Sequence, residues 1–346
     1  MKYRTLGDSG LKVSTLCLGS MTWGSQNTEA EGHRQIDMAL EAGVNFIDTA
    51  EMYPVNPVRV ETIGNTEKII GNWFAKSGKR DKVILATKAA GAGQAARGGA
   101  PITAVTVRNC IEDSLRRLQT DVIDLYQLHV PNRGTWSFRR NWTYDPSVQN
   151  TAAVAENMAE VMGELAAQVK AGRIRAFGLS NETAWGVIAW NRTAAACGGP
   201  RVASVQNEYS LLCRLYDLDL AEVSHHENVA LLAFSPLATG LLTGKYGAGM
   251  IPTPSRRARS PELGGRITPR VWGAVEAYMA IAKRHGLDPA QMALAFVLSR
   301  PFLGSAILGA TTEAQLANDL AAVDVTLSAE VLDEIAAAHK AWPMPF

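Results

Sequence analysis

Short apolar runs alternate with longer amphipathic stretches along almost the whole chain. Runs rich in aliphatic and β-branched residues indicate strands, and apolar residues spaced three or four positions apart indicate helices. Strands separated by helices pair in parallel, because a parallel pair needs a long crossover connection. Eight strands are predicted, at residues 15–19, 44–48, 82–87, 122–129, 174–180, 203–206, 229–235 and 305–308. Eight parallel strands are the number that closes a barrel.

Helical patterns fill most of the segments between these strands. They lie at 29–42, 66–76, 104–118, 154–171, 183–196, 215–226 and 313–322, and Asp288-Pro289 opens an extra helix at 288–299. Residues 2–13, with the turn sequence GDSG in their middle, are expected to form a hairpin that plugs the bottom of the barrel. The expected fold class is α/β: an (α/β)8 TIM barrel with an N-terminal β-hairpin, formed by residues 1–346 as a single domain.

Two long segments interrupt this regular order, and both are expected at the C-terminal face of the barrel. Residues 131–151 directly follow a predicted strand and mix aromatic with cationic side chains, which suits a lid over an anionic or aromatic substrate. The alternative is an ordered surface loop that packs on the barrel rim. Residues 247–270 are rich in Gly, Pro and Arg, with Arg256, Arg257 and Arg259 close together. This second segment is either a flexible solvated loop or a belt over a phosphate-bearing cofactor.

Charge and composition narrow the range of partners. The 34 basic and 33 acidic residues leave a formal net charge of +1, so there is no excess charge to hold nucleic acid or an anionic membrane. The four cysteines are far apart and form no CxxC pair, which argues against a metal site or a disulfide framework. No apolar run is long enough for a signal peptide or a membrane span. A cytoplasmic protein with a small-molecule partner is expected, and its oligomeric state is left open.

Four polar residues stand at the ends of predicted strands or just beyond them: Asp48, Tyr53, Lys88 and His129. Asp48, Lys88 and His129 lie one βα unit apart, and the carboxyl ends of barrel strands meet at one face, where barrel enzymes build their active sites. Together these side chains can deliver a proton to a carbonyl oxygen while a hydride arrives at the carbon. Taken singly, each has a structural explanation, such as turn capping or rim packing. Their joint occurrence favours catalysis.

The chain resembles the aldo-keto reductases over essentially its whole length, and within that family it is most similar to the bacterial Tas-type reductases. The resemblance rests on the motifs DTAEMYP, RLQTDVIDLYQLH, GLSNETAWGV, LTGKY, HGLDPAQMALAFV and LGATTEAQL, in this order. It implies that NADPH gives a hydride to a carbonyl carbon while Tyr53 protonates the oxygen. Lys88 is then expected to lower the pKa of this phenol, with Asp48 as the counter-ion of the lysine. His129 is expected to donate a hydrogen bond to the carbonyl oxygen.

The resemblance also implies that the cofactor is held by loops, because the chain has no glycine-rich dinucleotide fingerprint. At the nicotinamide end, Ser180 and Asn181, helped by Gln206, are expected to bond the carboxamide, while Tyr209 stacks on the ring. For the three polar residues the alternative is ordinary strand-end capping. The full set expected at this end is Gly19, Met21, Asp48, Ser180, Asn181, Gln206 and Tyr209.

The phosphates and the adenosine are expected further along the chain. Backbone amides after the seventh strand can approach a pyrophosphate, Lys245 is expected to bind a phosphate, and the segment after the last strand is expected to hold the adenosine. The residues expected here are Ser235, Pro236, Leu237, Gly240, Leu241, Lys245, Arg256, Gly309, Thr311, Gln315 and Asp319. The family typically has Asn where this chain has Asp319, which can accept but, when ionised, cannot donate a hydrogen bond.

The substrate is expected to contact Met21, Trp23, Tyr53, His129 and Trp136, although core packing is an equal alternative for Met21 and Trp23. The expected function is NADPH-dependent reduction of an aldehyde or ketone to an alcohol. Two alternatives remain: an alcohol dehydrogenase that uses NAD or NADP, and a regulatory subunit that senses redox state through NADPH with little turnover. The potassium-channel β subunits that resemble this family carry asparagine at the position of His129, so this histidine favours the enzyme.

Overall fold

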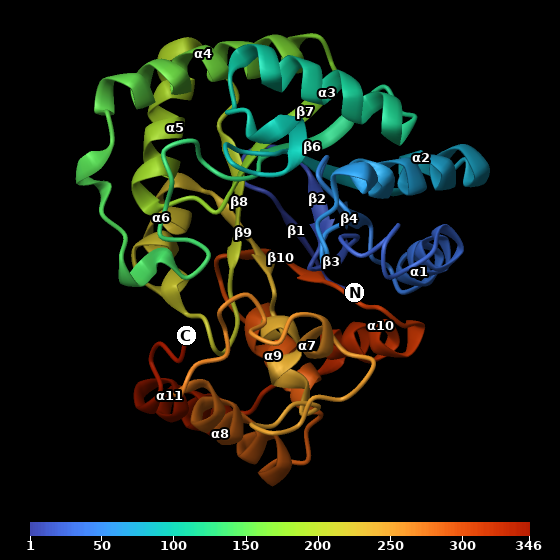
Figure 1. Ribbon diagram of the computed structural model, residues 1–346, viewed down its shortest axis with the longest axis vertical. Coiled ribbons are helices and arrows are strands. Elements are labelled where there is room, and N and C mark those ends of the chain that lie inside the picture. The colour runs from blue at the N-terminus through green and yellow to red at the C-terminus, as the bar shows by residue number, and fades with distance from the viewer.

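The computed structural model describes residues 1–346, and its eight parallel strands close into a barrel, as predicted. Helices surround the barrel (Figure 1). The strands follow chain order around the barrel and pair in parallel throughout. They are β3 (Leu16–Gly19), β4 (Phe46–Asp48), β5 (Ile84–Ala89), β6 (Ile123–Leu128), β7 (Ile174–Ser180), β8 (Val202–Glu208), β9 (Ala230–Phe234) and β10 (Leu303–Leu308). The (α/β)8 barrel is therefore confirmed.

Local chemistry explains where the helices begin and end. Thr28 and Glu31 form a capping box that starts α1, and Thr103 starts α3 in the same way. Gly78 and Gly198 end α2 and α5 in left-handed conformations that glycine adopts without strain. The helices are α1 (Glu29–Glu41), α2 (Asn65–Ser77), α3 (Ala104–Leu118), α4 (Thr151–Lys170), α5 (Ala184–Cys197), α6 (Asp219–Glu227), α7 (Arg256–Arg259), α8 (Val271–Arg284), α9 (Pro289–Leu298), α10 (Glu313–Leu320) and α11 (Ala329–Ala341).

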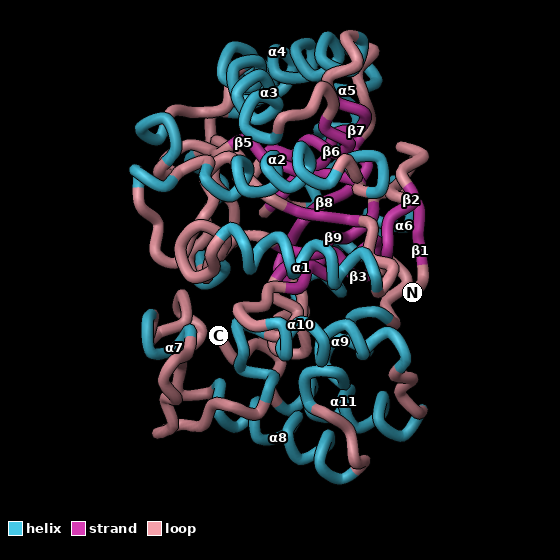
Figure 2. The backbone as a smooth tube through the Cα atoms, turned by 90° about the vertical axis from the view of Figure 1, so that its right-hand side faces the viewer, coloured by secondary structure: helices cyan, strands magenta, loops and turns pink.

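Three of these helices were not predicted from the sequence pattern: the short α7 within residues 247–270, α8 and α11. Helices α8 and α11 pack on each other at one end of the molecule, away from most of the barrel strands (Figure 2). The first half of the helix expected at 215–226 is instead a short 3-10 turn, η6 (Leu215–Asp217), so that α6 begins only at Asp219. No helix combines the length and the apolar character that crossing a bilayer requires.

Alternation along the strands divides the core into two layers. Side chains at alternate positions point into the barrel, so Phe46 of β4, Ala86 of β5 and Leu125 of β6 share an inner cluster, while their neighbours face the helices. The N-terminal hairpin, β1 (Tyr3–Thr5) paired antiparallel with β2 (Lys12–Ser14), adds Leu6 and Leu11 to the same inner cluster. The hairpin closes one end of the barrel and leaves the carboxyl ends of the strands as the accessible face.

The contact between α2 and α3 is close enough to require a glycine. A Cβ atom added at Gly71 would lie 2.8 Å from the backbone carbon of Leu118 and would also collide with the carbonyl oxygen of Arg117. Backbone atoms cannot move aside as a flexible side chain can, so the two helices would have to separate.

We expect Gly71→Ala to lower the free energy of unfolding by about 1–3 kcal/mol, because overpacking forces backbone shifts. Gly163→Ala is the matched control: Gly163 is exposed in α4 and has nothing within 4 Å of its added Cβ. The control should be stabilised by up to about 1 kcal/mol through helix propensity. Urea denaturation of both variants measures the difference, and equal stability of the two would contradict the packing argument.

Candidate active site

The inward-facing positions change from apolar to polar near the carboxyl ends of the strands. Above Phe46, Ala86 and Leu125, two residues further along each strand, stand Asp48, Lys88 and Gln127. Strand pairing aligns Lys88 with Gln127, and the same parity places His129 on the inner side directly after β6. The barrel fold therefore brings together residues that are far apart in the sequence.

Lys88 and Asp48 form an ion pair inside the barrel. The distance between Lys88 Nζ and Asp48 Oδ2 is 2.6 Å, and the side chains are 0% and 3% exposed. Lys88 also donates to the carbonyl oxygen of Thr49 at 2.7 Å. Burial alone would lower the pKa of Lys88, but Asp48 and then Tyr53 raise it above its ordinary value. The lysine is therefore a permanent cation at neutral pH.

Two glutamines occupy the other oxygen of Asp48. Gln206 and Gln127 donate to Asp48 Oδ1 at 2.8 and 3.2 Å, and Gln206 also donates to Gln127 Oε1 at 3.2 Å. A buried carboxylate needs such donors to offset its lost hydration. Gln127 was not predicted from the sequence, although its position two residues before His129 in the run YQLH gives it the same inward direction.

Tyr53 lies at the mouth of the barrel next to the ion pair and to His129. Lys88 Nζ is 5.0 Å from the centre of the tyrosine ring, and the Tyr53 and His129 rings meet edge to face with centroids 5.9 Å apart. Burial raises the pKa of Tyr53 above its ordinary value, while Lys88 acts in the opposite direction. The sequence predicts that Lys88 lowers the pKa of Tyr53, but not that the opposite effect of burial is larger.

His129 is buried and electrically neutral. Burial, and next the charge of Lys88, hold the pKa of His129 well below its ordinary value. Its backbone is fixed by two bonds, from its own N–H to the carbonyl of Ala89 and from Asn181 Nδ2 to its carbonyl at 2.9 Å. Its ring Nδ1 atom is buried without a hydrogen-bond partner, and its Nε2 atom makes no hydrogen bond within the protein either. The imidazole therefore keeps its hydrogen-bonding capacity for a ligand or water.

The amide residues at the ends of β7 and β8 are joined to this group. Ser180 donates to the carbonyl of Gln206 at 2.9 Å, and Asn181 Nδ2 donates to Ser180 Oγ at 3.1 Å. Because the amide nitrogens of Asn181 and Gln206 are used inside the protein, their side-chain oxygens are left as acceptors. Such acceptors suit the NH₂ group of a carboxamide.

Residues 235–240, which we call the phosphate loop, have an unusual backbone. Ser235, Ala238 and Thr239 have positive φ angles of 52°, 46° and 59°, and Gly240 follows at 99°. Non-glycine residues rarely adopt this conformation, and a right-handed residue followed by a left-handed one, as at Leu237 and Ala238, can turn neighbouring N–H groups toward an anion. The N–H groups of Ala238 and Gly240 themselves donate to the carbonyls of Ser235 and Leu237. A Cβ atom at Gly240 would lie 2.8 Å from Lys245 Cε, so the lysine chain lies directly against this loop. The residues present therefore fit a phosphate-bearing cofactor.

Arg256 adds a cation without a partner. It belongs to the segment 247–270, the belt, and is partly buried but makes no ion pair. Burial, and next the charge of Arg266, lower the pKa of Arg256 to about 10. The other clustered arginines are occupied: Arg257 bonds the carbonyls of Gly247, Ala248 and Met250, and Arg259 bonds Gln26 beyond β3.

The lid loop, residues 131–150, is anchored along the rim. Its Thr135 donates to the carbonyl of Asn181 at 3.0 Å, and Arg133 pairs with Glu182 in a nearly fully buried contact. Arg139 reaches Glu208 at the end of β8, which also binds Arg266 of the belt at 2.8 Å. Trp136 is partly exposed. These contacts make residues 131–150 an ordered part of the rim, joined to the belt through the carboxylate of Glu208.

The remaining expected residues lie after β9, after β10 or at the end of β3. Gln315 accepts from the backbone N–H of Thr311 at 3.0 Å across the start of α10, and both are exposed. Asp319, one turn further along α10, is only 5% exposed. Gly19 ends β3, and a Cβ atom there would lie 2.7 Å from the carbonyl of Leu308. Of the other expected residues, Gly309 and Lys245 are exposed, and Met21, Ser235 and Leu237 are partly exposed. Pro236 and Leu241 are buried.

Two aromatic residues do not fit their expected roles. Tyr209 is 0% exposed, stacks on Phe296 with centroids 6.3 Å apart, and donates to Asp217 at 2.6 Å. Trp23 is also 0% exposed and donates from its indole N–H to Gln35 at 3.1 Å. A side chain with no exposed surface cannot stack on a cofactor or line a pocket. Core packing, the alternative that the sequence left open for Trp23, explains both.

Phe234 is the aromatic residue that the structure places at the mouth instead. It ends β9, is partly exposed, and packs on the inner cluster rather than the outer one. The alternation of Ala230, Leu232 and Phe234 on one face of β9 is the signal that could have identified it.

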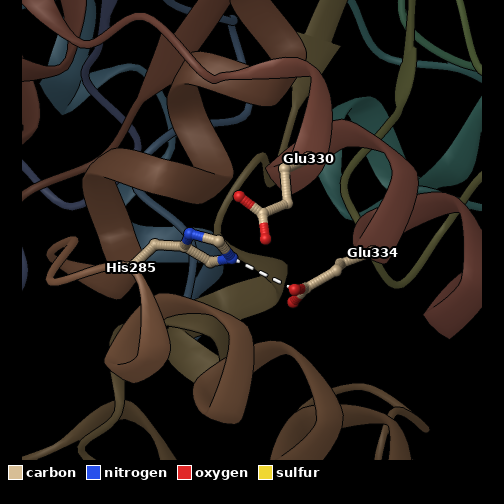
Figure 3. Close-up of side chains that lie close together, drawn as sticks. All are labelled: His285, Glu330 and Glu334. Carbon is tan, nitrogen blue, oxygen red and sulfur yellow. Dashed lines mark hydrogen bonds and ion pairs between the residues drawn. The ribbon is translucent and has the colours of Figure 1, made fainter.

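Two other features lie outside the catalytic group. A cavity of about 330 Å³ is lined by Leu128, Leu179 and Trp190 and also by Ser180 and Arg133, but not by Asp48, Tyr53, Lys88 or His129. His285, Glu330 and Glu334 gather where α8 meets α11 (Figure 3), with 3.2 Å between His285 Nε2 and Glu334 Oε1. Arg284 pairs with the other oxygen of Glu334 at 2.6 Å, so His285 and Glu334 belong to an ion-pair contact between the two helices, whereas Glu330 makes no ion pair.

The fold and the site define the class of protein: an (α/β)8 barrel that holds a phenol, a buried lysine cation and a neutral imidazole at the carboxyl ends of its strands. Residues 15–340 match the Aldo/keto reductase family, and the chain belongs to this family. It is 45% identical to Protein tas of Escherichia coli (strain K12), over 100% of this chain and 99% of that protein. Family membership supports an oxidoreductase that acts on carbonyl compounds.

More distant relatives differ in their described roles. The chain is 32% identical to the uncharacterized oxidoreductase YrpG of Bacillus subtilis (strain 168), over 96% of this chain and 94% of that protein. It is 31% identical to a probable voltage-gated potassium channel subunit beta of Oryza sativa subsp. japonica, over 99% and 98% of the two chains. Similarity of the whole chain therefore extends both to an oxidoreductase and to a channel subunit.

The buried ion pair leads to a prediction for stability. Asp48→Asn leaves the cation of Lys88 buried without its counter-ion, which should cost about 3–5 kcal/mol of unfolding free energy. The double variant Asp48→Asn/Lys88→Met removes both charges and should be clearly more stable than the single variant. Urea denaturation at pH 7 measures the stability of both variants. A double variant no more stable than the single one would show that the unpaired charge of Lys88 is not the cause of the lost stability.

Proposed function

We propose that this protein is an NADPH-dependent reductase of aldehydes or ketones in which Tyr53 is the general acid. The observation that carries the proposal is the arrangement of Tyr53 beside the buried cation of Lys88 and the neutral ring of His129. A phenol near a fixed cation can give up a proton and remain as a stabilised phenolate. When bound, NADPH supplies the hydride.

The protein residues divide the remaining work. His129 can donate a hydrogen bond to the carbonyl oxygen from a ring that stays neutral, which orients the substrate and stabilises the charge that develops on the oxygen. Lys88 acts on the tyrosine, and Asp48 keeps the lysine charged and in place. Met21 and Trp136, both partly exposed at the rim, are the proposed walls for the substrate.

The cofactor is proposed to lie along the carboxyl ends of β7 to β10. The side-chain oxygens of Asn181 and Gln206 would accept from the carboxamide, and Ser180 supports them. Phe234 offers an aromatic surface for the nicotinamide ring. The phosphate loop and Lys245 would hold the pyrophosphate, with Arg256 closing over it from the belt.

The adenosine end is proposed to lie against Gly309, Thr311 and Gln315 near the start of α10. The extra phosphate of NADPH would then lie near the N-terminus of α10, where the helix dipole and the hydroxyl group of Thr311 favour negative charge. The second candidate is a regulatory subunit that binds NADPH with little turnover, which the similarity to a probable potassium channel subunit favours.

Tyr53→Phe should lower kcat for carbonyl reduction by about 10²- to 10⁴-fold, because it removes the proton donor. Its affinity for NADPH should stay near that of the parent protein. NADPH consumption is measured with a panel of aliphatic, aromatic and 2-oxo aldehydes and ketones, with NADH in parallel. Tyr3→Phe, in the exposed hairpin, is the control for loss of a phenol elsewhere.

The same panel separates the two candidate functions. Turnover that depends on Tyr53 supports the reductase. NADPH binding without turnover of any carbonyl compound would overturn it and support the regulatory subunit.

Arg256→Gln should raise the Kd for NADPH roughly ten- to hundredfold, because a charged hydrogen bond to a phosphate contributes about 1.5–3 kcal/mol. Arg270→Gln is the matched control, since Arg270 is an exposed arginine at the end of the same belt. Fluorescence titration with NADPH measures both variants. Equal Kd values for the two variants would show that Arg256 does not contact the cofactor.

A further inference from the structure

The outer side of the barrel wall carries a cavity that the proposed function does not use. This space of about 330 Å³ lies against Leu128 at the end of β6 and Leu179 near the end of β7, with Trp190 of α5 beside them. All three side chains belong to the helix-facing layer of the core and are at most 5% exposed. Protein interiors contain few voids larger than a water molecule, whereas this volume falls within the range of small-molecule sites.

Both ends of the lid loop line the mouth of this cavity. Residues 131–133 and 148–150 contribute from opposite ends of the loop, and α4 contributes Ala153 and Met158. Val148 is 83% exposed and Ala153 is also exposed, whereas Met158 is only 4% exposed. The cavity therefore leads from an exposed edge beside the lid loop to an apolar base against the barrel wall.

The charges in the lining cancel each other. Arg133 and Glu182 are its charged side chains, they form an ion pair, and they are 5% and 0% exposed. Arg133 Nη1 donates to Glu182 Oε2 at 3.1 Å, and the backbone N–H of Thr183 donates to Glu182 Oε1 at 2.7 Å. A charged ligand would lose hydration here without meeting an unpaired opposite charge. The lining therefore favours a neutral ligand.

Two amide side chains at the mouth keep free hydrogen-bonding groups. Asn132 and Asn157 bond each other, with 3.0 Å between Asn132 Nδ2 and Asn157 Oδ1. In contrast, Gln149 donates from Nε2 to the carbonyl of Arg133 at 3.2 Å, but its Oε1 accepts no hydrogen bond within the protein. Asn150 Oδ1 accepts from the backbone N–H three residues later at 3.1 Å, and its Nδ2 makes no bond. One acceptor and one donor are thus left for a ligand.

We propose that this cavity is a binding site for a neutral aromatic molecule of about two rings that carries an N–H or O–H group. Its rings would pack between Trp190 and Met158, because indole rings and thioether sulfur atoms make favourable contacts with aromatic groups. Its polar hydrogen would be donated to Gln149 Oε1. The site is separate from the catalytic group, and the proposal does not depend on the proposed function.

The probe for this site is N-phenyl-1-naphthylamine, a neutral aromatic amine with one N–H group whose fluorescence rises in apolar surroundings. The full chain is titrated into a fixed low concentration of the probe, which is excited directly. Binding should saturate at one probe per chain, with a Kd on the order of 10–100 µM.

A matched pair of variants locates the probe. Ala153→Trp places a large side chain in the mouth and should raise the Kd roughly tenfold or more. Ala152→Trp is the control, because Ala152 is the exposed neighbour on α4 that does not line the cavity, and its Kd should stay near that of the parent protein. Thermal unfolding of both variants checks their stability. If Ala153→Trp is destabilised, Ala153→Leu, a smaller filler with high helix propensity, takes its place.

Two analogues of the probe test the chemistry of the site. 1-Anilinonaphthalene-8-sulfonate adds a negative charge, so the part of its binding that Ala153→Trp removes should be roughly tenfold weaker or more. The N-methyl derivative of the probe lacks the donor and should bind roughly two- to tenfold more weakly, the loss expected for one hydrogen bond.

The proposal is overturned by any of three results. They are no saturable binding of the neutral probe to the parent protein, equal Kd values for the Ala153 and Ala152 variants, and binding of the sulfonate at this site as tight as that of the neutral probe. Equal Kd values would place the probe elsewhere, for example at the mouth of the barrel.

Discussion

The ion pair between Lys88 and Asp48 is the constraint on which the rest of the site depends. Two full charges inside a barrel are tolerated only if they neutralise each other and their remaining hydrogen-bonding capacity is filled. That requirement explains why Gln127 and Gln206, on two other strands, point inward to the same carboxylate. The pairing register of the strands must therefore be the one that brings these glutamines to the counter-ion of Lys88. Lys88 then acts on both neighbouring rings: its charge opposes the effect of burial on the pKa of Tyr53 and adds to it at His129.

The apolar half of the barrel leaves the polar side chains around the ion pair, which we call the polar layer, open on one side only. Inward residues below the ion pair form a closed cluster, and the N-terminal hairpin covers the end of the barrel with Leu6 and Leu11. Water and ligands can therefore reach the polar layer only from the carboxyl ends of the strands. The burial that results keeps the imidazole of His129 neutral and raises the pKa of Tyr53.

The loops above this layer are organised by a second carboxylate. Glu208, at the end of β8, binds Arg139 of the lid loop and Arg266 of the belt, so one residue joins the two long insertions. One carboxylate offsets only one of these two positive charges, so the contact keeps a net positive charge at the rim. Anchoring of this kind also fixes the positions of both insertions, so less conformational entropy would be lost if a ligand bound beside them.

The sequence by itself determined the eight-stranded barrel and the four polar residues at or near its strand ends, because periodicity and strand ends are local properties of the chain. It did not predict α8 or α11, which pack on each other outside the βα order. The tertiary structure alone decided which aromatic residues reach the mouth, since Tyr209 and Trp23 are buried by partners distant in the sequence whereas Phe234 is not. It also decided the pKa of Tyr53, because burial is a sum over the whole fold that no motif contains.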